Sequence, residues 1–144
     1  MKKYFVLIFS VVVVVIAAVL TLSRSRSAVV YINNATIVVI VADDVGKWEK
    51  GLSGMQSLEN DRGMLFVFPD SQRRLFWMRG MKFPIDIIWI RDGRVVGITK
   101  NVLPPTDDIV PDAWSPGPVS MVLEVPANFS DQYRIATGTE LSIH

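Results

Sequence analysis

The pattern of apolar positions changes once along the chain, near residue 27. From Tyr4 to Leu22 the sequence is apolar except for Ser10 and Thr21. A helix over this segment would be about 28 Å long, close to the roughly 30 Å hydrocarbon core of a bilayer. We therefore predict a single transmembrane anchor that begins at Tyr4 and ends at Leu22.

The same segment could instead be a secretory signal peptide that is cleaved after export. Ser25-Arg26-Ser27 offers small residues at the spacing of a cleavage site, but the apolar region of such peptides is usually about 7 to 15 residues long. Length therefore favours a retained anchor. Lys2 and Lys3 precede the apolar segment, and a basic flank that faces the cytoplasm would place residues 28–144 on the extracytoplasmic side of the cytoplasmic membrane. Residues 1–27 are then the anchor and a short polar tether.

Residues 28–144 carry short, β-branched or alternating apolar runs that are typical of β-strands. Asp92-Gly93 between two such runs predicts a hairpin, and Asn33-Asn34-Ala35 favours a second one. The predicted strands cover residues 28–32, 36–41, 64–68, 74–78, 85–90, 95–99, 119–125 and 141–143.

One short helix is predicted between the second and third strands. Asp43-Asp44 can cap its first turn, and Trp48, Leu52 and Met55 recur on one helical face that Gly54 would end. We therefore expect a mainly β, compact, single-domain fold, barrel-like or a sandwich, with one short helix and an N-terminal transmembrane helix before it.

The segment "LPPTDDIVPDAWSPGP", residues 103–118, holds five of the chain's eight prolines. Proline lacks an N–H donor, so this density argues against an interior strand or helix and predicts a surface loop. Long loops on a rigid scaffold often carry function. A stiff connection wrapped over one end of a barrel is the alternative.

Composition excludes several classes of site. The chain has no cysteine, so it has no disulfide, thiolate nucleophile or cysteine-bound metal, and its only histidine is His144. Asp107, Asp108 and Asp112 lack the spacing of a calcium loop, so we predict no metal and no other cofactor. The net charge of +1, with scattered Lys and Arg, does not indicate a nucleic-acid surface.

Two carboxylates stand in otherwise apolar strands. Asp86 lies within "FWMRGMKFPIDIIWI", residues 76–90, and Glu124 lies between Leu123 and Val125. As candidate catalytic residues they would form an acid–base pair of the kind used in glycoside hydrolysis. The alternative, which we favour, is that each accepts hydrogen bonds from loop backbone and stabilises a turn.

Large apolar side chains near Asp86 could form a ligand surface. Trp77 and Met78 precede it in the same segment, and Trp114 stands in the proline-rich loop, where a large ring is hard to bury. The candidate ligand-binding residues are therefore Trp77, Met78, Asp86 and Trp114. Aromatic residues in strands are more often core, and we expect this of Trp77 and Trp89.

Five motifs stand in a specific order: "GLSGM" at 51–55, "GMLFVFP" at 63–69, "FWMRGMKFPIDIIWI" at 76–90, "DGRVVGI" at 92–98 and "VLEVPA" at 122–127. Over residues 28–144 the chain closely resembles the family called domain of unknown function 192. The resemblance implies a compact, mostly β domain, often exported, with no known activity. The family pattern usually has a basic residue at Met55, an asparagine at Pro126, a glycine at Asn128 and an acid at Thr139, so a site that used those positions would be incomplete here.

These observations favour a membrane-anchored, extracytoplasmic β domain that acts by binding. Its partners would be the membrane, through the N-terminal helix, and an unknown protein or small-molecule ligand. Two alternatives remain open: a hydrolase that uses Asp86 and Glu124, and a purely structural envelope protein.

Overall fold

The computed structural model describes residues 26–144. The predicted anchor, Tyr4 to Leu22, lies outside the described residues. Within residues 26–144, no helix is both long and apolar enough to cross a membrane.

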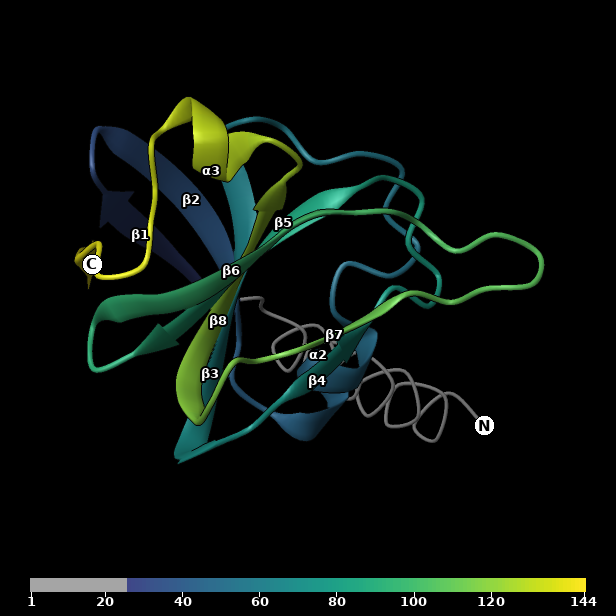
Figure 1. Ribbon diagram of the computed structural model, residues 1–144, viewed down its shortest axis with the longest axis horizontal. Helices are drawn as coiled ribbons and strands as arrows, with labels where there is room; N and C mark the ends of the chain where they lie inside the picture. Colours follow the sequence, from purple (N-terminus) through teal and green to yellow (C-terminus); the bar gives the residue numbers. More distant parts are fainter. Residues whose placement is uncertain (1–25) are drawn as a thin grey trace, which may run out of the picture.

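The described chain is mainly β, with two short helices (Figure 1). Its elements are β1 (Ser27–Ile32), β2 (Ala35–Ala42), α2 (Val45–Lys50), β3 (Arg62–Gln72), β4 (Leu75–Trp77), β5 (Ile85–Arg91), β6 (Arg94–Val102), β7 (Asp112–Trp114), β8 (Val119–Pro126), α3 (Phe129–Gln132) and β9 (Leu141–Ile143). All eight predicted strands are present. The expectation of one helix was wrong because α3, which has only four residues and no side-chain cap, gives no periodic signal.

Seven strands form one sheet in the order β6-β5-β8-β3-β2-β1-β9. All neighbours are antiparallel except β2 and β3, which α2 and the segment after it connect in parallel. The ends of the sheet approach each other, because the Val95 N–H donates to the Thr139 carbonyl (2.9 Å) and the Leu141 N–H donates to that of Gly93 (3.1 Å). The sheet is therefore a curled half-barrel.

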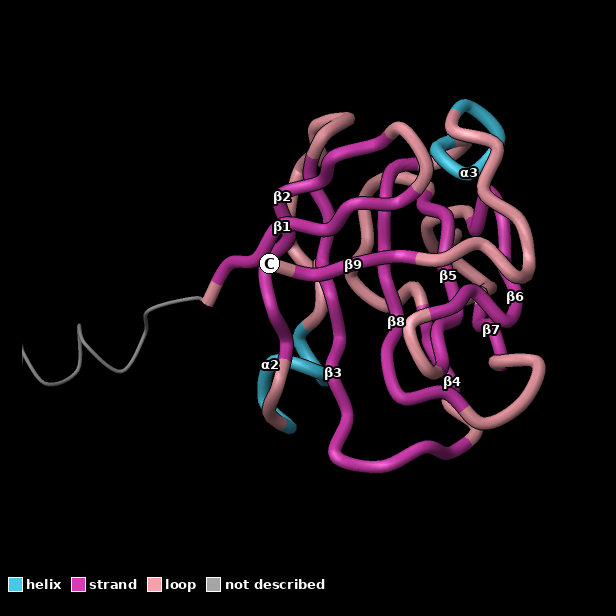
Figure 2. Tube along the Cα trace, turned by 90° about the vertical axis from the view of Figure 1, so that its left-hand side faces the viewer, coloured by secondary structure: helices cyan, strands magenta, loops and turns pink. Residues whose placement is uncertain are grey.

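Both faces of the sheet are apolar, and each packs a separate core. Along β5, Ile88 and Ile90 belong to the core inside the curl, whereas Ile87 and Trp89 belong to the core on the other face. This alternation follows from the two-residue period of a strand. Figure 2 shows α2 and α3 at opposite ends of the molecule, so each end of the half-barrel has its own short helix.

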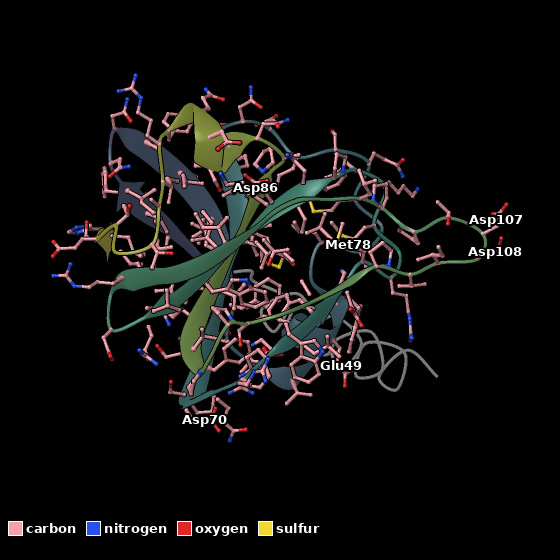
Figure 3. The ribbon with its side chains drawn as sticks, viewed as in Figure 1. Glu49, Asp70, Met78, Asp86, Asp107 and Asp108 are labelled. Carbon is pink, nitrogen blue, oxygen red and sulfur yellow. The ribbon has the colours of Figure 1, made fainter. Side chains whose placement is uncertain are left out.

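The outer core is covered in part by a second, two-stranded sheet, here called the β4–β7 ribbon. Leu75 pairs with Trp114, Phe76 with Ala113 and Trp77 with Asp112. The prediction that the proline-rich segment is a surface loop throughout was therefore wrong, although β7 is an edge strand of a two-stranded sheet and not an interior strand. Between Pro111 and Pro116 the chain has enough N–H donors for a three-residue edge strand, whereas the tip with Asp107 and Asp108 projects as a loop (Figure 3).

Candidate functional site

A cavity of about 210 Å³ lies between α2, β4 and the outer face of the half-barrel. Its walls come from α2 and the turn after it, from β3, from β4 and from single residues of two further segments. The lining residues are Val45, Trp48, Glu49, Lys50, Gly51, Leu52, Ser53, Phe66, Phe68, Arg74, Leu75, Phe76, Trp77, Met81 and Glu124. Most of these side chains are apolar or aromatic, which is typical of sites for small ligands.

Aromatic contacts hold β4 over the sheet. The Phe76 ring meets the Phe66 ring edge-to-face, with centroids 4.8 Å apart, and the Trp89 ring at 5.5 Å. On the other side of the cavity, the Trp48 indole N–H donates to the Ala42 carbonyl (2.9 Å), which fixes the ring against Phe68. Both walls are therefore held in place by packing within the domain.

Glu124 lies in the cavity wall with only 6% of its surface exposed. Its Oε2 is buried and has no hydrogen-bond partner among the described residues. Burial raises the pKa of its carboxyl group from the ordinary 4.5 to about 8, because desolvation disfavours the charged form. At neutral pH the group is therefore mostly a carboxylic acid, which can donate one hydrogen bond and accept others.

Arg74 supplies a second buried polar group at the wall. Its guanidinium carbon lies 4.1 Å from the centre of the Phe68 ring, and its Nη2 forms an ion pair with Asp70. Its Nε is buried and has no acceptor within residues 26–144. A buried donor without a partner is costly. Glu124 and Arg74, which both line the cavity, therefore each contain a buried polar atom with unmet hydrogen-bonding capacity.

Asp86 has a different environment. It is fully buried, and its carboxylate accepts backbone N–H bonds from Asn101 (2.9 Å), Asn128 (3.3 Å) and Ser130 (2.9 Å). Asn101 and Asn128 both have positive φ, 52° and 68°. Asp86 therefore ties the end of β6, the end of β8 and α3 together, which is the role of a structural acceptor.

The structure does not bring Asp86 and Glu124 together. Glu124 lies opposite Ile87 in the β5–β8 ladder and shares its face, whereas Asp86 lies opposite Val125 and projects from the other face. Figure 3 shows Asp86 beside α3, far from Glu49 at the rim of the cavity. The described geometry offers no site at which these two carboxylates could act on one substrate.

Of the other large apolar residues that the sequence analysis named, two are exposed and two are buried. Trp77 and Trp114 are 46% and 55% exposed on the outer face of the β4–β7 ribbon, so the expectation that Trp77 is core was wrong. Trp89 is core as predicted, and Met78 is buried but does not line the cavity. Of these four residues only Trp77 reaches the cavity, at its mouth.

Two residues that line the cavity could not be recognised as site residues from the sequence. Trp48 was assigned to the apolar face of the predicted helix, and the structure confirms that α2 follows the Asp44 cap, whose side chain accepts from the Lys47 N–H. Arg74 stands at the start of a predicted strand, where a basic residue is ordinary. Only the folded arrangement shows that both face the same cavity.

The four positions at which the chain departs from the usual family pattern do not line this cavity. Asn128 adopts the left-handed conformation that glycine also favours. The Thr139 hydroxyl accepts from the Ala136 N–H at 3.1 Å and so stabilises the turn before β9. These two substitutions are compatible with the local backbone.

Comparison with known structures identifies two similar folds. A candidate transcription regulator from Sinorhizobium meliloti superposes with a TM-score of 0.74 at 27% identity, over 83% of this chain and 95% of that one. A protein of unknown function from Novosphingobium aromaticivorans gives 0.70 at 26% identity, over 82% and 84%. Since 95% of the first crystallised chain is this unit, the unit folds there without a further domain.

No curated protein matches the chain. A family model does match residues 28–143, almost the whole of the described region, and its description is "Uncharacterized ACR, COG1430". The order of the five motifs, the half-barrel fold and this match agree. The chain belongs to the domain of unknown function 192 (DUF192) family.

Proposed function

We propose that this protein is a binding module, held at the extracytoplasmic face of the membrane by residues 4–22, and that its ligand site is the cavity between α2 and β4. The observation that carries the proposal is that Glu124 Oε2 and Arg74 Nε are buried without hydrogen-bond partners, in two residues that line a cavity whose side chains are mostly apolar. Native interiors rarely leave such groups unpaired, and a ligand is one way to satisfy them.

A binding role accounts for these features better than the two alternatives. A carboxylate hydrolase needs two groups on one substrate, and Asp86 and Glu124 project from opposite faces of the sheet. A purely structural domain would gain stability from a filled cavity without buried, unpaired polar atoms. The name of the Sinorhizobium neighbour suggests regulation, but the net charge of only +1, with scattered Lys and Arg, does not indicate a nucleic-acid surface.

The cavity is large enough for one substituted aromatic ring, since an apolar cavity of about 150 Å³ already accepts benzene. A test therefore compares p-cresol with toluene, which differ by one hydroxyl group. In 1H–15N spectra of residues 26–144, both compounds should shift the Trp48 indole N–H signal. This signal is identified by its absence from the spectrum of Trp48→Phe. We expect p-cresol to bind roughly threefold to tenfold more tightly, the worth of one additional hydrogen bond.

Variants then locate the effect. Glu124→Leu removes the buried acid and should abolish the preference for p-cresol while toluene still binds. Asp131→Asn, at an exposed site beside Lys100, is the matched control and should leave both affinities unchanged. If neither compound shifts the Trp48 signal, the proposal of a ligand site in this cavity is wrong.

A further inference from the structure

Strand β4 uses only one of its two edges. The Arg74 carbonyl accepts from the Ser115 N–H and the Met78 N–H donates to the Pro111 carbonyl, both at 2.9 Å, and Phe76 pairs with Ala113 between them. In an antiparallel pair, the backbone groups of successive residues point alternately to the two sides. The N–H and C=O groups of Leu75 and Trp77 therefore point away from β7.

Those four backbone groups have no hydrogen-bond partner within residues 26–144. Leu75 is 37% and Trp77 46% exposed, so a partner can reach them. A strand edge with unpaired N–H and C=O groups is a template for another strand, and peptide-binding domains use such edges.

The open edge and the cavity lie on the same side of β4. Residues 74–77 form one wall of the cavity and α2 forms another, whereas no β7 residue lines it. A chain paired with β4 would run along the cavity.

We propose that β4 accepts an extended segment of a partner protein as an added strand, and that an aromatic side chain with a hydroxyl group from this segment fills the cavity and hydrogen-bonds to Glu124. This inference rests on the proposed function and specifies its ligand. The added strand would turn the β4–β7 ribbon into a three-stranded sheet.

The direction of the inserted side chain follows from register. Phe76 points inward, onto Phe66 and Trp89. Residues directly opposite each other in paired strands project on the same face, so the partner residue opposite Phe76 also points inward, toward the cavity. Its two neighbours lie opposite Leu75 and Trp77 and make the hydrogen bonds to the open edge.

The hydroxyl group follows from the chemistry of Glu124 Oε2. A phenol both donates and accepts, so it can pair with this oxygen whether or not the oxygen carries the proton. Phenylalanine would fill the same space but leave Oε2 unpaired. A tyrosine side chain meets both requirements.

The charged side chains near β4 indicate which residues flank that tyrosine in the partner segment. The Arg73 guanidinium lies 5.5 Å from the centre of the Trp114 ring, and that of Arg79 lies 5.7 Å from the centre of the Trp77 ring. Within the described chain, neither arginine forms an ion pair. Acidic residues at the two ends of the partner segment would complement them.

The probe is the acetylated, amidated peptide Glu-Val-Tyr-Val-Glu, titrated into residues 26–144 by isothermal calorimetry. It should bind at least tenfold more tightly than p-cresol, since it adds backbone bonds and charge pairs. Replacing Tyr with Ala should weaken binding at least tenfold, and replacing it with Phe roughly threefold to tenfold. N-methylation of both valines, which removes the donors aimed at β4, should weaken it at least tenfold.

Two protein variants test the edge separately from the cavity. Leu75→Pro removes the Leu75 N–H, which points away from β7, and edge strands tolerate proline at such positions. This variant should weaken peptide binding threefold to tenfold. Leu75→Ala keeps the N–H and should retain most of the peptide affinity. Because Leu75 also lines the cavity, Leu75→Ala is the reference for p-cresol, and the Pro and Ala variants should bind p-cresol with equal affinity. If Leu75→Pro does not fold, the N-methylated peptide decides.

The outcomes separate the two proposals. If p-cresol binds but N-methylation leaves the affinity of the peptide unchanged, the added strand is refuted and the ligand site stands. If neither p-cresol nor the peptide binds, both fail. If the protein self-associates through this edge and Leu75→Pro makes it monomeric, the occupant is a second copy, and the inference of a different partner is wrong.

Discussion

Asp86 and Glu124 lie on neighbouring strands, yet their carboxyl groups project from opposite faces of the half-barrel. Asp86 is satisfied by three backbone N–H groups, whereas Glu124 has a buried oxygen without a partner. The first arrangement stabilises the fold, and the second leaves hydrogen-bonding capacity at a cavity. Two acids that look alike in the sequence therefore have different roles, and each role makes a prediction.

Glu124 should make the stability of the domain depend on pH. Its pKa is about 8 in the folded protein and near 4.5 in an ordinary environment. Between these values the folded carboxyl group keeps a proton that the unfolded chain has lost, so rising pH favours the unfolded chain. The free energy of unfolding should therefore fall from about pH 4.5 to pH 8, by up to about 1.4 kcal/mol for each unit of the pKa difference, and this effect should end above pH 8.

Urea denaturation between pH 4 and 9 measures this contribution. Glu124→Gln has no ionisable group at this position. The free energy of unfolding of the parent should therefore fall relative to that of the variant as the pH rises from about 4.5 to 8. Glu49→Gln, at the exposed rim of the same cavity, is the control and should follow the parent. Parallel profiles for the parent and Glu124→Gln would show that Glu124 is not a buried neutral acid.

Asp86 should act on stability alone. Asp86→Asn keeps the shape and one acceptor oxygen, so it should cost about 1 to 3 kcal/mol through weaker bonds and a mismatched N–H donor. Asp86→Ala leaves three backbone donors unpaired and should cost more. Urea denaturation of both variants at pH 7 measures these losses, and p-cresol should bind the folded Asn variant as it binds the parent. An Asn variant at least as stable as the parent would contradict the structural role.

The strand pattern was predictable because both faces of the sheet are buried and turns mark its ends. Asp92 and Gly93 have φ values of 52° and 70°, as the hairpin signal requires, and Asn33 has a φ of 50° in the first turn. α3 was not predictable, since it is held by tertiary contacts, including the bond from the Ser130 N–H to Asp86. Local sequence carries no information on that bond.

The cavity was harder to predict than the strands. Its walls come from residues far apart in the chain, and only the crossing of β4 over the sheet brings Trp48, Arg74 and Glu124 to one place. Trp77 was misassigned for a related reason. Alternation shows which residues share a face, but β4 lies outside the main sheet, and nothing local indicates that its Trp77 face is the exposed one.

The chain without its N-terminal segment should fold on its own. β1 begins at Ser27, and the Val41 N–H donates to the Arg26 carbonyl at 2.8 Å, so the first contacts start one or two residues before the expected boundary at Ala28. Residues 26–144 should give a β-type circular dichroism spectrum and one cooperative melting transition. Residues 28–144, which lack the Arg26 carbonyl and the first pair of β1, should also fold but melt at a lower temperature. An insoluble or non-cooperative product from residues 26–144 would contradict this boundary.

The full-length protein should remain in the membrane fraction after washing with alkaline carbonate. A transmembrane helix over residues 4–22 is held by its apolar surface, which salt and alkali do not remove, whereas a domain bound only by charge is released. Residues 26–144 expressed alone are the control and should be recovered in the soluble fraction. N-terminal sequencing of the mature protein then separates the two forms of export. A chain that begins near Ala28 and is released from the membrane would show that the segment is a cleaved signal peptide, and would make the protein a secreted binding module.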